Sequence, residues 1–423
     1  MKKTNLLKVI LAVALLLSCV CFTGCDLVKG AIGGIINSGG LDFGGGSSDC
    51  QHENYVGRQQ APTCTEDGAD MRLCVNCGKV LEKTTIPALG HDYVDGVCTR
   101  CGAKENVSGD TYTREDNYIY FGSYPQTKVT DSATLNALSS YKGTLPTSDN
   151  DQDWIDYEYY MEGSNTTAFM WYKDVTYSGN KFRAVYFTSY RSWNCSDTSG
   201  TYQEDNGYNT DTVYWFKYEP IKWRILTESN GSAFLMSEIA IDGQHYYHTD
   251  DRITRTINSK TVYENNYAES DIRAWLNETF YTTAFNSAQQ SLIKTTLVDN
   301  SAASTNPNNI QWFNGVNNYA CEDTNDKIFL LSQKEVTNSA YGFSSGTGQS
   351  AARQLKSSDY AKSQGCYSKT SSSYIGECLW VLRSPDCSRS YYAHGVDIDG
   401  LACVSIVVNG TGHGIVPALW INL

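Results

Sequence analysis

Hydrophobic residues after position 112 fall mostly into short alternating runs, which is typical of β-strands. Residues 118–124 alternate in this way, and residues 221–226 and 233–236 form two apolar runs on either side of Ser229-Asn230-Gly231. An Asn-Gly pair between two such runs favours a tight hairpin turn. Residues 327–332 form a further apolar run that predicts a buried strand. We therefore expect a domain built mainly from short strands.

Two segments have helical spacing instead. The first begins at Ser270, a favourable N-cap residue, with Asp271 in the first turn. Its apolar face is formed by Ile272, Trp275, Leu276 and Phe280. The second predicted helix covers residues 287–293, and a Ser/Gly-rich loop from Ser344 leads to more short strands up to Leu423. Few helices among many strands predict the α+β fold class.

The N-terminus has the pattern of an export signal. Lys2 and Lys3 precede an apolar run over residues 6–20, followed by Phe22-Thr23-Gly24-Cys25. A small residue directly before cysteine resembles the lipobox of bacterial lipoproteins, in which the thiol is acylated; the alternative is an ordinary signal peptide. We expect residues 1–24 to be removed, Cys25 to carry lipid, and the Gly/Ser-rich residues 25–49 to act as a flexible tether. The mature protein would then be extracytoplasmic and lipid-anchored to the bacterial cell membrane.

The chain has 423 residues and a formal net charge of −13. This acidic balance, without Lys/Arg runs beyond the first few residues, argues against nucleic acid or anionic lipid as a partner. Neutral, polar or cationic partners fit better. The 30 tyrosines and 9 tryptophans favour a binding role, because both are common recognition residues.

Residues 50–104 form a cysteine- and histidine-rich module. Two Cys-x-x-Cys-Gly turns, at residues 74–78 and 98–102, place thiolate pairs as zinc sites require. Eight ligands would serve two structural zinc ions. They are Cys50, His52, Cys64, Cys74, Cys77, His91, Cys98 and Cys101. Three disulfides are the alternative, but they would leave both histidines without a role.

The module also contains an incomplete internal repeat. His52 precedes the first Cys-x-x-Cys-Gly turn as His91 precedes the second, and only the first copy has Cys64. The pattern resembles zinc-ribbon-like repeats in bacterial surface proteins. The simplest grouping puts His52, Cys64, Cys74 and Cys77 in one site, and His91, Cys98, Cys101 and Cys50 in the other. We expect a small spacer domain that is stabilised by its metal ions or disulfides and has no open coordination position for catalysis.

Five motifs after residue 112 carry a second resemblance. They are Tyr120-Phe-Gly-Ser-Tyr-Pro-Gln126, Pro220-Ile-Lys-Trp-Arg-Ile-Leu226, Ser270-Asp-Ile-Arg-Ala-Trp-Leu276, Leu379-Trp-Val-Leu-Arg-Ser-Pro385 and Gly414-Ile-Val-Pro-Ala-Leu-Trp-Ile-Asn422. Residues 112–423 thus resemble a domain family of unknown function in bacterial surface lipoproteins. That family is similar to the C-type-lectin-like fold, in its formylglycine-generating-enzyme-like form, used by variable proteins of diversity-generating retroelements. Residues 141–215 look like an insertion.

The resemblance implies a diversified ligand site near the C-terminus, written by error-prone copying at adenines. Codons AAC or AAT randomised at their adenines never encode Lys, Glu, Gln, Met or Trp. These five residue types make up about 15% of the chain, yet none occurs in residues 386–416. Their joint absence by chance is on the order of one in a hundred or two hundred. We therefore interpret residues 386–416 as the variable segment.

The expected ligand-binding residues in this segment are chemically diverse. They are Asp386, Ser388, Arg389, Tyr391, Tyr392, His394, Asp397, Asp399, Leu401, Ser405 and His413. The residues between them are interpreted as a fixed frame, namely Ala393, Val396, Gly400, Val404 and residues 417–420. Alternating strands would expose one face and bury the other. The partner would be a protein or glycan at the cell surface.

Other interpretations of the same residues are weaker. His394, Asp397 and Asp399 are better explained as independent surface residues than as a metal or acid–base cluster. Cys387 and Cys403 fit chance products of diversification better than a disulfide or an oxidase-type pair, and Arg383 fits a structural ion pair. The calcium-binding motifs of sugar-binding lectins are missing from the sequence, so we predict no calcium. We expect no enzyme; the alternatives are an extracellular formylglycine-generating-type enzyme and a static adhesion or envelope lipoprotein.

Overall fold

The computed structural model describes residues 51–423 except for 65–66, 78, 88, 90–92, 95–96, 102–110, 148–152, 158–168, 194–201, 250–251, 253, 306–316 and 371–372. The predicted signal, Cys25 and the tether lie outside the described residues. None of the helices within the described residues is long and apolar enough to span a membrane. The chain divides into two compact units between Ser108 and Gly109.

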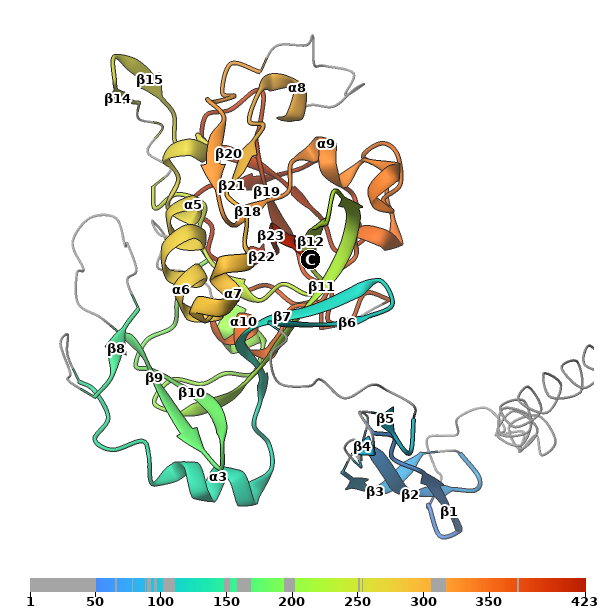
Figure 1. Cartoon of the computed structure of the whole chain (residues 1–423). Coiled ribbons are helices and arrows are strands. Elements are labelled where there is room, and N and C mark those ends of the chain that lie inside the picture. The colour runs from blue at the N-terminus through green and yellow to red at the C-terminus, as the bar shows by residue number, and fades with distance from the viewer. Residues whose placement is uncertain are drawn as a thin grey trace, which may run out of the picture. The chain divides into compact units, whose positions relative to one another are not determined.

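The smaller unit is a three-stranded antiparallel sheet with a short hairpin (Figure 1). Its strands are β1 (Tyr55–Gln60), β2 (Gly68–Cys74) and β3 (Val80–Ile86), and the hairpin is β4 (Tyr93–Val94) with β5 (Val97–Cys98). Side chains on β1 and β3 are almost all exposed. In the described part of this unit, the buried hydrophobic residues are Cys64, Ala69 and Cys74. Burial of so little apolar surface cannot stabilise the unit alone.

The larger unit is organised around a nine-stranded antiparallel sheet. Its main path runs β18-β23-β12-β11-β10-β9-β8, and β7 pairs with β11 and β6. The bounds are β6 Tyr112–Glu115, β7 Tyr118–Lys128, β8 Ile155–Asp156, β9 Met170–Tyr177, β10 Asn180–Phe187, β11 Tyr214–Ser229, β12 Ser232–Ser237, β18 Phe329–Leu330 and β23 Pro417–Asn422. The C-terminal strand thus lies inside this sheet, between β12 and β18.

A second sheet of five strands runs β13-β22-β19-β20-β21. Its strands are β13 (Asp242–Gly243), β22 (Gly414–Ile415), β19 (Trp380–Pro385), β20 (Tyr392–Val396) and β21 (Val404–Val407). All its pairings are antiparallel except β19 with β22. Two small ladders complete the strands, β14 (Arg255–Ile257) with β15 (Lys260–Val262), and β16 (Thr296–Val298) with β17 (Thr324–Asp326).

The predicted hairpin is confirmed. Strands β11 and β12 pair with Ser229 opposite Ser232, so Asn230 and Gly231 form the turn. Both turn residues have positive φ, 51° and 70°. This is the backbone that a two-residue turn between twisted strands requires, and Asn and Gly adopt it at the lowest cost.

The helices are short and few. The first predicted helix is confirmed, with Ser270 accepting a hydrogen bond from the Arg273 backbone N–H. It consists of α5 (Asp271–Trp275), a π-helical turn η2 (Leu276–Phe280) and α6 (Tyr281–Ala284). The second is α7 (Ser287–Leu292), capped by Asn286. The others are α3 (Ser132–Ser139), α4 (Tyr202–Asp205), α8 (Ala302–Thr305), α9 (Gln333–Val336), α10 (Asp359–Ser363), and the 3-10 turns η1 (Tyr267–Glu269), η3 (Ser339–Tyr341) and η4 (Ala351–Arg353). The α+β class is confirmed, with mostly antiparallel sheets and few helices.

The larger unit has two hydrophobic clusters. The main one lies between the two sheets and the helices, and includes Trp223 and Trp380, whose indole N–H groups donate to the Phe121 and Arg353 carbonyls. The second consists of Leu138, Trp154, Trp171, Phe182, Ala184, Tyr186 and Trp215. Much of the second cluster comes from residues 141–215, so this segment extends the main sheet and has a core of its own. Trp275, on the apolar face of the first predicted helix, and Trp420 are half-buried against the main cluster.

Candidate functional site

The variable segment, residues 386–416, contains β20, β21 and β22 of the five-stranded sheet. Strands β20 and β21 pair with Tyr392 opposite Val407 and His394 opposite Ser405. Ser388 and Ser405 are exposed. Arg389, Tyr391, Tyr392, Asp397, Asp399 and Leu401 are half-buried. The segment thus presents a partly open surface around the start of β20.

Three of the expected ligand residues are buried. Asp386, His394 and His413 are only 4%, 5% and 9% exposed, so they do not belong to an open binding face. Four of the five residues of β20 are buried, and Ala393 and Val396 belong to the main hydrophobic cluster, so neither face of this strand is open. Alternation separates an exposed face from a buried one only where one side of the sheet is open. Burial also lowers the pKa of His394.

Asp386 has a local structural role instead. One carboxylate oxygen accepts hydrogen bonds from the backbone N–H and hydroxyl of Ser388, at 2.7 and 2.6 Å. The other accepts from the Ser405 hydroxyl at 2.7 Å. Although burial alone would raise the pKa of Asp386, these hydrogen bonds hold it below its ordinary value. Asp386 therefore ties the loop before β20 to β21.

An aromatic and cationic group forms the open part of the segment. The Tyr391 and Tyr392 rings lie 4.8 Å apart, centre to centre. The guanidinium of Arg389 lies 3.9 Å from the Tyr392 ring centre, and that of Arg252 lies 4.4 Å from the Tyr391 ring centre. Arg389 also donates to the Ser405 hydroxyl at 3.0 Å. The fold therefore brings together four of the expected ligand residues, with Arg252 added from another loop.

A cavity of about 300 Å³ opens beside the same segment. Its lining includes Asp397, Val407, Gly410, Gly412 and His413 from the variable segment. The remainder of the wall is Trp193, Tyr202, Tyr367 and Leu379. The Trp193 and Tyr202 rings lie 5.6 Å apart, and those of Tyr202 and Tyr367 lie 5.1 Å apart. Three stacked or edge-on aromatic rings thus face residues of the variable segment across one cavity.

His413 is a neutral polar group in this wall. Burial lowers its pKa to about 3, so the imidazole is uncharged at neutral pH. Its Nδ1 atom is buried and has no hydrogen-bond partner. A buried polar atom without a partner costs free energy that a ligand hydrogen bond can recover. His413 is therefore suited to a polar contact with a ligand inside the cavity, although it does not lie on an exposed face of the sheet.

The structure does not bring His394, Asp397 and Asp399 together as a metal cluster. Asp397 accepts from the backbone N–H of Ile398 at 2.8 Å, and Asp399 accepts from that of Leu401 at 3.0 Å. These are turn contacts within the loop between β20 and β21. In the part of the chain that the structure describes, the one metal-like group of three or more ligands lies elsewhere.

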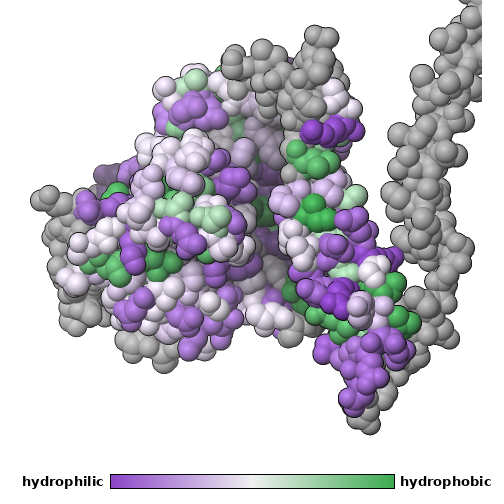
Figure 2. Space-filling view, turned by 90° about the horizontal axis from the view of Figure 1, so that it is seen from below, coloured by the Kyte–Doolittle hydropathy of each residue, from purple (hydrophilic) through white to green (hydrophobic). Residues whose placement is uncertain are grey.

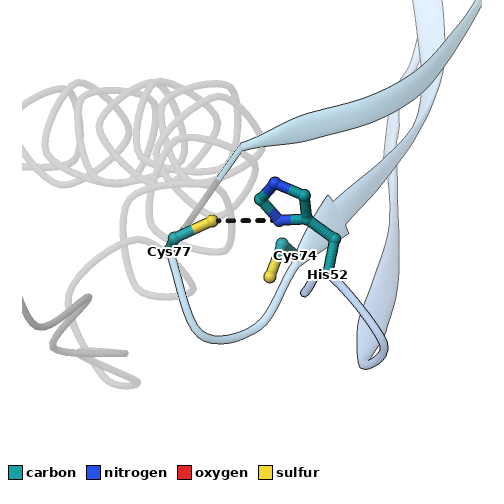
Figure 3. Close-up of side chains that lie close together, drawn as sticks. All are labelled: His52, Cys74 and Cys77. Atoms are coloured by element: carbon teal, nitrogen blue, oxygen red, sulfur yellow. Dashed lines mark hydrogen bonds between the residues drawn. The ribbon is translucent and has the colours of Figure 1, made fainter. Parts of the chain in front are cut away.

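That group is His52, Cys74 and Cys77 (Figure 3). Their ligand atoms all lie within 4.8 Å of one another, and Cys77 Sγ is 3.4 Å from His52 Nδ1. Cys74 ends β2, and its backbone N–H donates to the Lys79 carbonyl across the turn that carries Cys77. The Val75 N–H donates to the Asn54 carbonyl, which holds the His52 segment against this turn. Two cysteines and a histidine at this spacing form a candidate metal-binding site.

The rest of the predicted zinc ligation is only partly described. Cys64 is buried but is not part of the group of three. For the second site, Cys50, His91 and the side chain of Cys98 lie outside the described residues, and Cys101 is exposed.

Arg383 forms the structural ion pair expected for it. Its side chain is 2% exposed and binds both carboxylate oxygens of Glu335, with the Nη2–Oε1 distance at 3.2 Å. It also donates to the carbonyls of Leu330 and Asp299. Arg383 therefore connects β19 to β18 and α9. Cys387 and Cys403 are both free thiols.

Sequence reasoning missed a second, more polar cavity of about 430 Å³. Its walls come from β8–β10, the α5–η2 segment, β7, β13 and α10. Asp271 at the start of α5 lies 3.3 Å from His245 Nε2 and 2.8 Å from His248 Nδ1. Burial alone would raise the pKa of Asp271, but these contacts hold it below its ordinary value.

Asp242 lies fully buried in the wall of the same cavity. It accepts hydrogen bonds from the Tyr124 hydroxyl at 2.6 Å and from the Gly243 N–H at 2.7 Å. Burial raises the pKa of Asp242 to about 6 in spite of these bonds. The wall also contains Arg183, which pairs with Asp174 through two hydrogen bonds of 2.8 and 2.9 Å. These residues share no local motif and are far apart in sequence, so only the fold could reveal the group.

The coloured part of the face in Figure 2 carries hydrophobic residues in small groups among hydrophilic ones. A binding site on the larger unit is therefore better sought in its cavities than in one apolar patch of that face.

Comparison with known proteins found one match to a family model, over part of the chain. Residues 230–423 match the family described as Domain of unknown function (DUF6273). No match was found among curated proteins or among solved structures. The matched region contains the whole variable segment and three of the five motifs, and it begins after the second hydrophobic cluster.

Proposed function

We propose that this protein is a surface-tethered ligand-binding protein whose binding site is diversified through residues 386–416. One observation carries the proposal: the cavity of about 300 Å³ combines Asp397, Val407 and His413 of that segment with three aromatic rings from outside it. Concave sites with aromatic walls and a few polar groups are typical of ligand binding. A change at Asp397 or Val407 would alter the cavity without altering the rings opposite.

The variable segment also contains glycine positions at which we expect no substitution. A Cβ on Gly395 would lie 1.9 Å from Ile406 Cδ1, and one on Gly400 would lie 2.0 Å from the Ser350 carbonyl oxygen. At Gly410 it would lie 2.3 Å from His413 Cε1. A side chain at Gly400 would clash with backbone, and one at Gly395 or Gly410 would force Ile406 or His413 to move. Half-buried positions such as Tyr391, by contrast, have room for other residues, so fixed and variable positions can alternate within one segment.

The resemblance to a C-type-lectin-like fold is part of this proposal. It is supported by the mixed α+β architecture and by a C-terminal strand inside the main sheet. We further propose that Cys25 carries the lipid anchor and that residues 50–104 hold two structural zinc ions. The His52, Cys74 and Cys77 group supports the first of these ions.

The enzyme alternative has less support. A formylglycine-generating-type enzyme needs a reactive cysteine in a pocket, because the thiolate is the reactive form. Cys387 and Cys403 line neither of the two cavities described above. Burial raises the pKa of Cys387, which makes its thiolate scarcer. A static adhesion protein would have the same cavity without sequence variation.

A binding screen tests the proposal. The purified chain is applied to arrays of glycans and of cell-surface proteins, and each ligand is retested with Asp397→Asn and with Leu297→Ala. Leu297 is 66% exposed, on β16, and serves as the control. We expect ligands of the wild-type chain to be lost with Asp397→Asn and kept with Leu297→Ala. Ligands that bind both variants equally, or no ligand at all, would contradict the proposed site.

A further inference from the structure

Two cysteines outside the sites above, Cys366 and Cys378, lie side by side in the core of the larger unit. Both residues are 0% exposed and are free thiols in the structure, and an interaction with the Cys366 side chain raises the pKa of Cys378. The Cys366 N–H donates to the Ala361 carbonyl at the end of α10, at 3.0 Å. The N–H of Cys378, which lies just before β19, donates to the Leu355 carbonyl at 2.9 Å. The backbone of each cysteine is therefore held in place by its own hydrogen bond.

A pair of glycines makes room for these cysteines. Gly243 of β13 lies opposite Gly414 of β22 in register. A Cβ on Gly243 would lie 3.3 Å from Cβ of Cys366, and a Cβ on Gly414 would lie 3.2 Å from Sγ of Cys378. The two cysteines thus pack against the same short ladder, and side chains on that ladder would push them away.

The chain between the cysteines is already a closed loop. The Lys369 N–H donates to the Glu377 carbonyl at 2.9 Å, and the Gly376 N–H donates back to Lys369 at 2.8 Å. Tyr367, directly after Cys366, donates its N–H to the Gly412 carbonyl and lines the aromatic cavity. A covalent link at the base of this loop would therefore also hold Tyr367 in place.

We propose that Cys366 and Cys378 are joined by a disulfide bond in the mature protein. One Sγ–Sγ bond forms and two S–H bonds break. The two protons pass to solvent, and the two electrons reduce a disulfide oxidant to two thiols. This oxidant is either a small-molecule disulfide such as oxidised glutathione or a thiol–disulfide oxidoreductase. This proposal is independent of ligand binding.

The burial of the pair determines when the bond forms. The contact with Cys366, together with burial, raises the pKa of Cys378 well above its ordinary value. Thiolate is the attacking species, and neither sulfur is accessible to an oxidant in the folded unit. The bond must therefore form while the chain folds, and once formed it is protected from external reductants.

Peptide mapping tests the proposal directly. The full chain, purified from an oxidising compartment, is alkylated with iodoacetamide in denaturant, digested and analysed by mass spectrometry. We expect a linked peptide pair containing unalkylated Cys366 and Cys378, and the same link after native treatment with dithiothreitol. A chain made in a reducing cytoplasm should have both residues alkylated. Alkylation of both residues in the oxidised sample, or links from either one to another cysteine, would overturn the proposal.

Thermal melting provides a second measurement. The variant with Cys366→Ala and Cys378→Ala should melt several degrees below the wild type when both come from the oxidising compartment, because the cross-link no longer restricts the unfolded chain. Cys387→Ala is the matched control and should leave both the linked peptide and the melting temperature unchanged. An equal melting temperature for the double variant and the wild type would also count against the bond.

Discussion

Gly412 lies directly against the ring of Tyr202, so that a Cβ on Gly412 would be 2.4 Å from Cε2 of that ring. The Gly412 carbonyl also accepts a hydrogen bond from the Tyr367 N–H, at 2.9 Å. Gly412 thus sets the distance between the variable segment and two of the three aromatic rings of the cavity.

The first prediction follows from this contact. Gly412→Ala should lower the free energy of unfolding by about 1–3 kcal/mol, the usual cost of forcing an extra methyl into a packed site. Gly348→Ala is the matched control, since a Cβ there would have no atom within 4 Å. Urea denaturation measures both. Equal stability of the two variants would show that Gly412 is not packed as described.

Sequence reasoning could predict those features that depend on local residue patterns. The Asn230-Gly231 turn and the Ser270 cap are local signals, because one needs residues with positive φ and the other a side-chain acceptor at a helix start. The Cys-x-x-Cys turn at Cys74 is equally local. The first two predictions are confirmed by the hairpin and by α5, and the His52–Cys74–Cys77 group bears out the third in part.

Features that depend on which elements become neighbours could not be predicted in this way. The burial of His394 depends on what packs over both faces of β20, which no short-range pattern reveals. The Cys366–Cys378 contact and the group around Asp242 and Asp271 join residues from separate elements. The second hydrophobic cluster was likewise hidden, since residues 141–215 looked only like an insertion.

The second prediction concerns zinc. Cys77→Ala should remove about one zinc ion per chain, because structural zinc needs a complete tetrahedral set of ligands. Cys321→Ala, in the larger unit, should leave the zinc content unchanged. Elemental analysis of the purified full chains measures both. A wild-type chain without zinc, or a Cys77→Ala chain that retains all of it, would contradict the proposed site.

The third prediction concerns the pH dependence of stability. The pKa of Asp242 is raised from 3.8 to about 6, so the folded state binds this proton more tightly than the unfolded state does. The resulting stabilisation is complete below about pH 4 and is lost as the pH rises through 6, by about 3 kcal/mol. Asp242→Asn should abolish this loss.

The measurement is the free energy of unfolding of both chains between pH 4 and pH 7. His245, His394 and His413 have lowered pKa values, so they favour folding as the pH rises and act in the opposite direction. They are present in both chains, and the difference between the two curves therefore isolates Asp242. A constant difference across this range would refute the shifted pKa.

The fourth prediction compares two ion pairs. Glu335→Gln should destabilise the larger unit by about 3–5 kcal/mol, because it leaves the buried Arg383 guanidinium without its counter-charge. Glu228→Gln is the control, since its partner Arg114 is 44% exposed and the loss of an exposed pair costs little. Guanidinium unfolding would show the contrast. Similar losses for the two variants would argue against a buried pair.

The central claim is that residues 386–416 vary around a fixed frame, and sequencing this gene from many sibling cells tests it most directly. We predict substitutions at the exposed and half-buried positions, restricted to residues reachable from AAC or AAT. These positions include Ser388, Arg389, Tyr391, Tyr392, Asp397, Asp399, Leu401 and Ser405. Gly395, Gly400, Gly410 and Gly412 should stay unchanged, because a side chain at any of them would force packed neighbours to move. An invariant segment in cells with an active reverse transcriptase beside the gene, or substitutions spread evenly along the chain, would contradict the account.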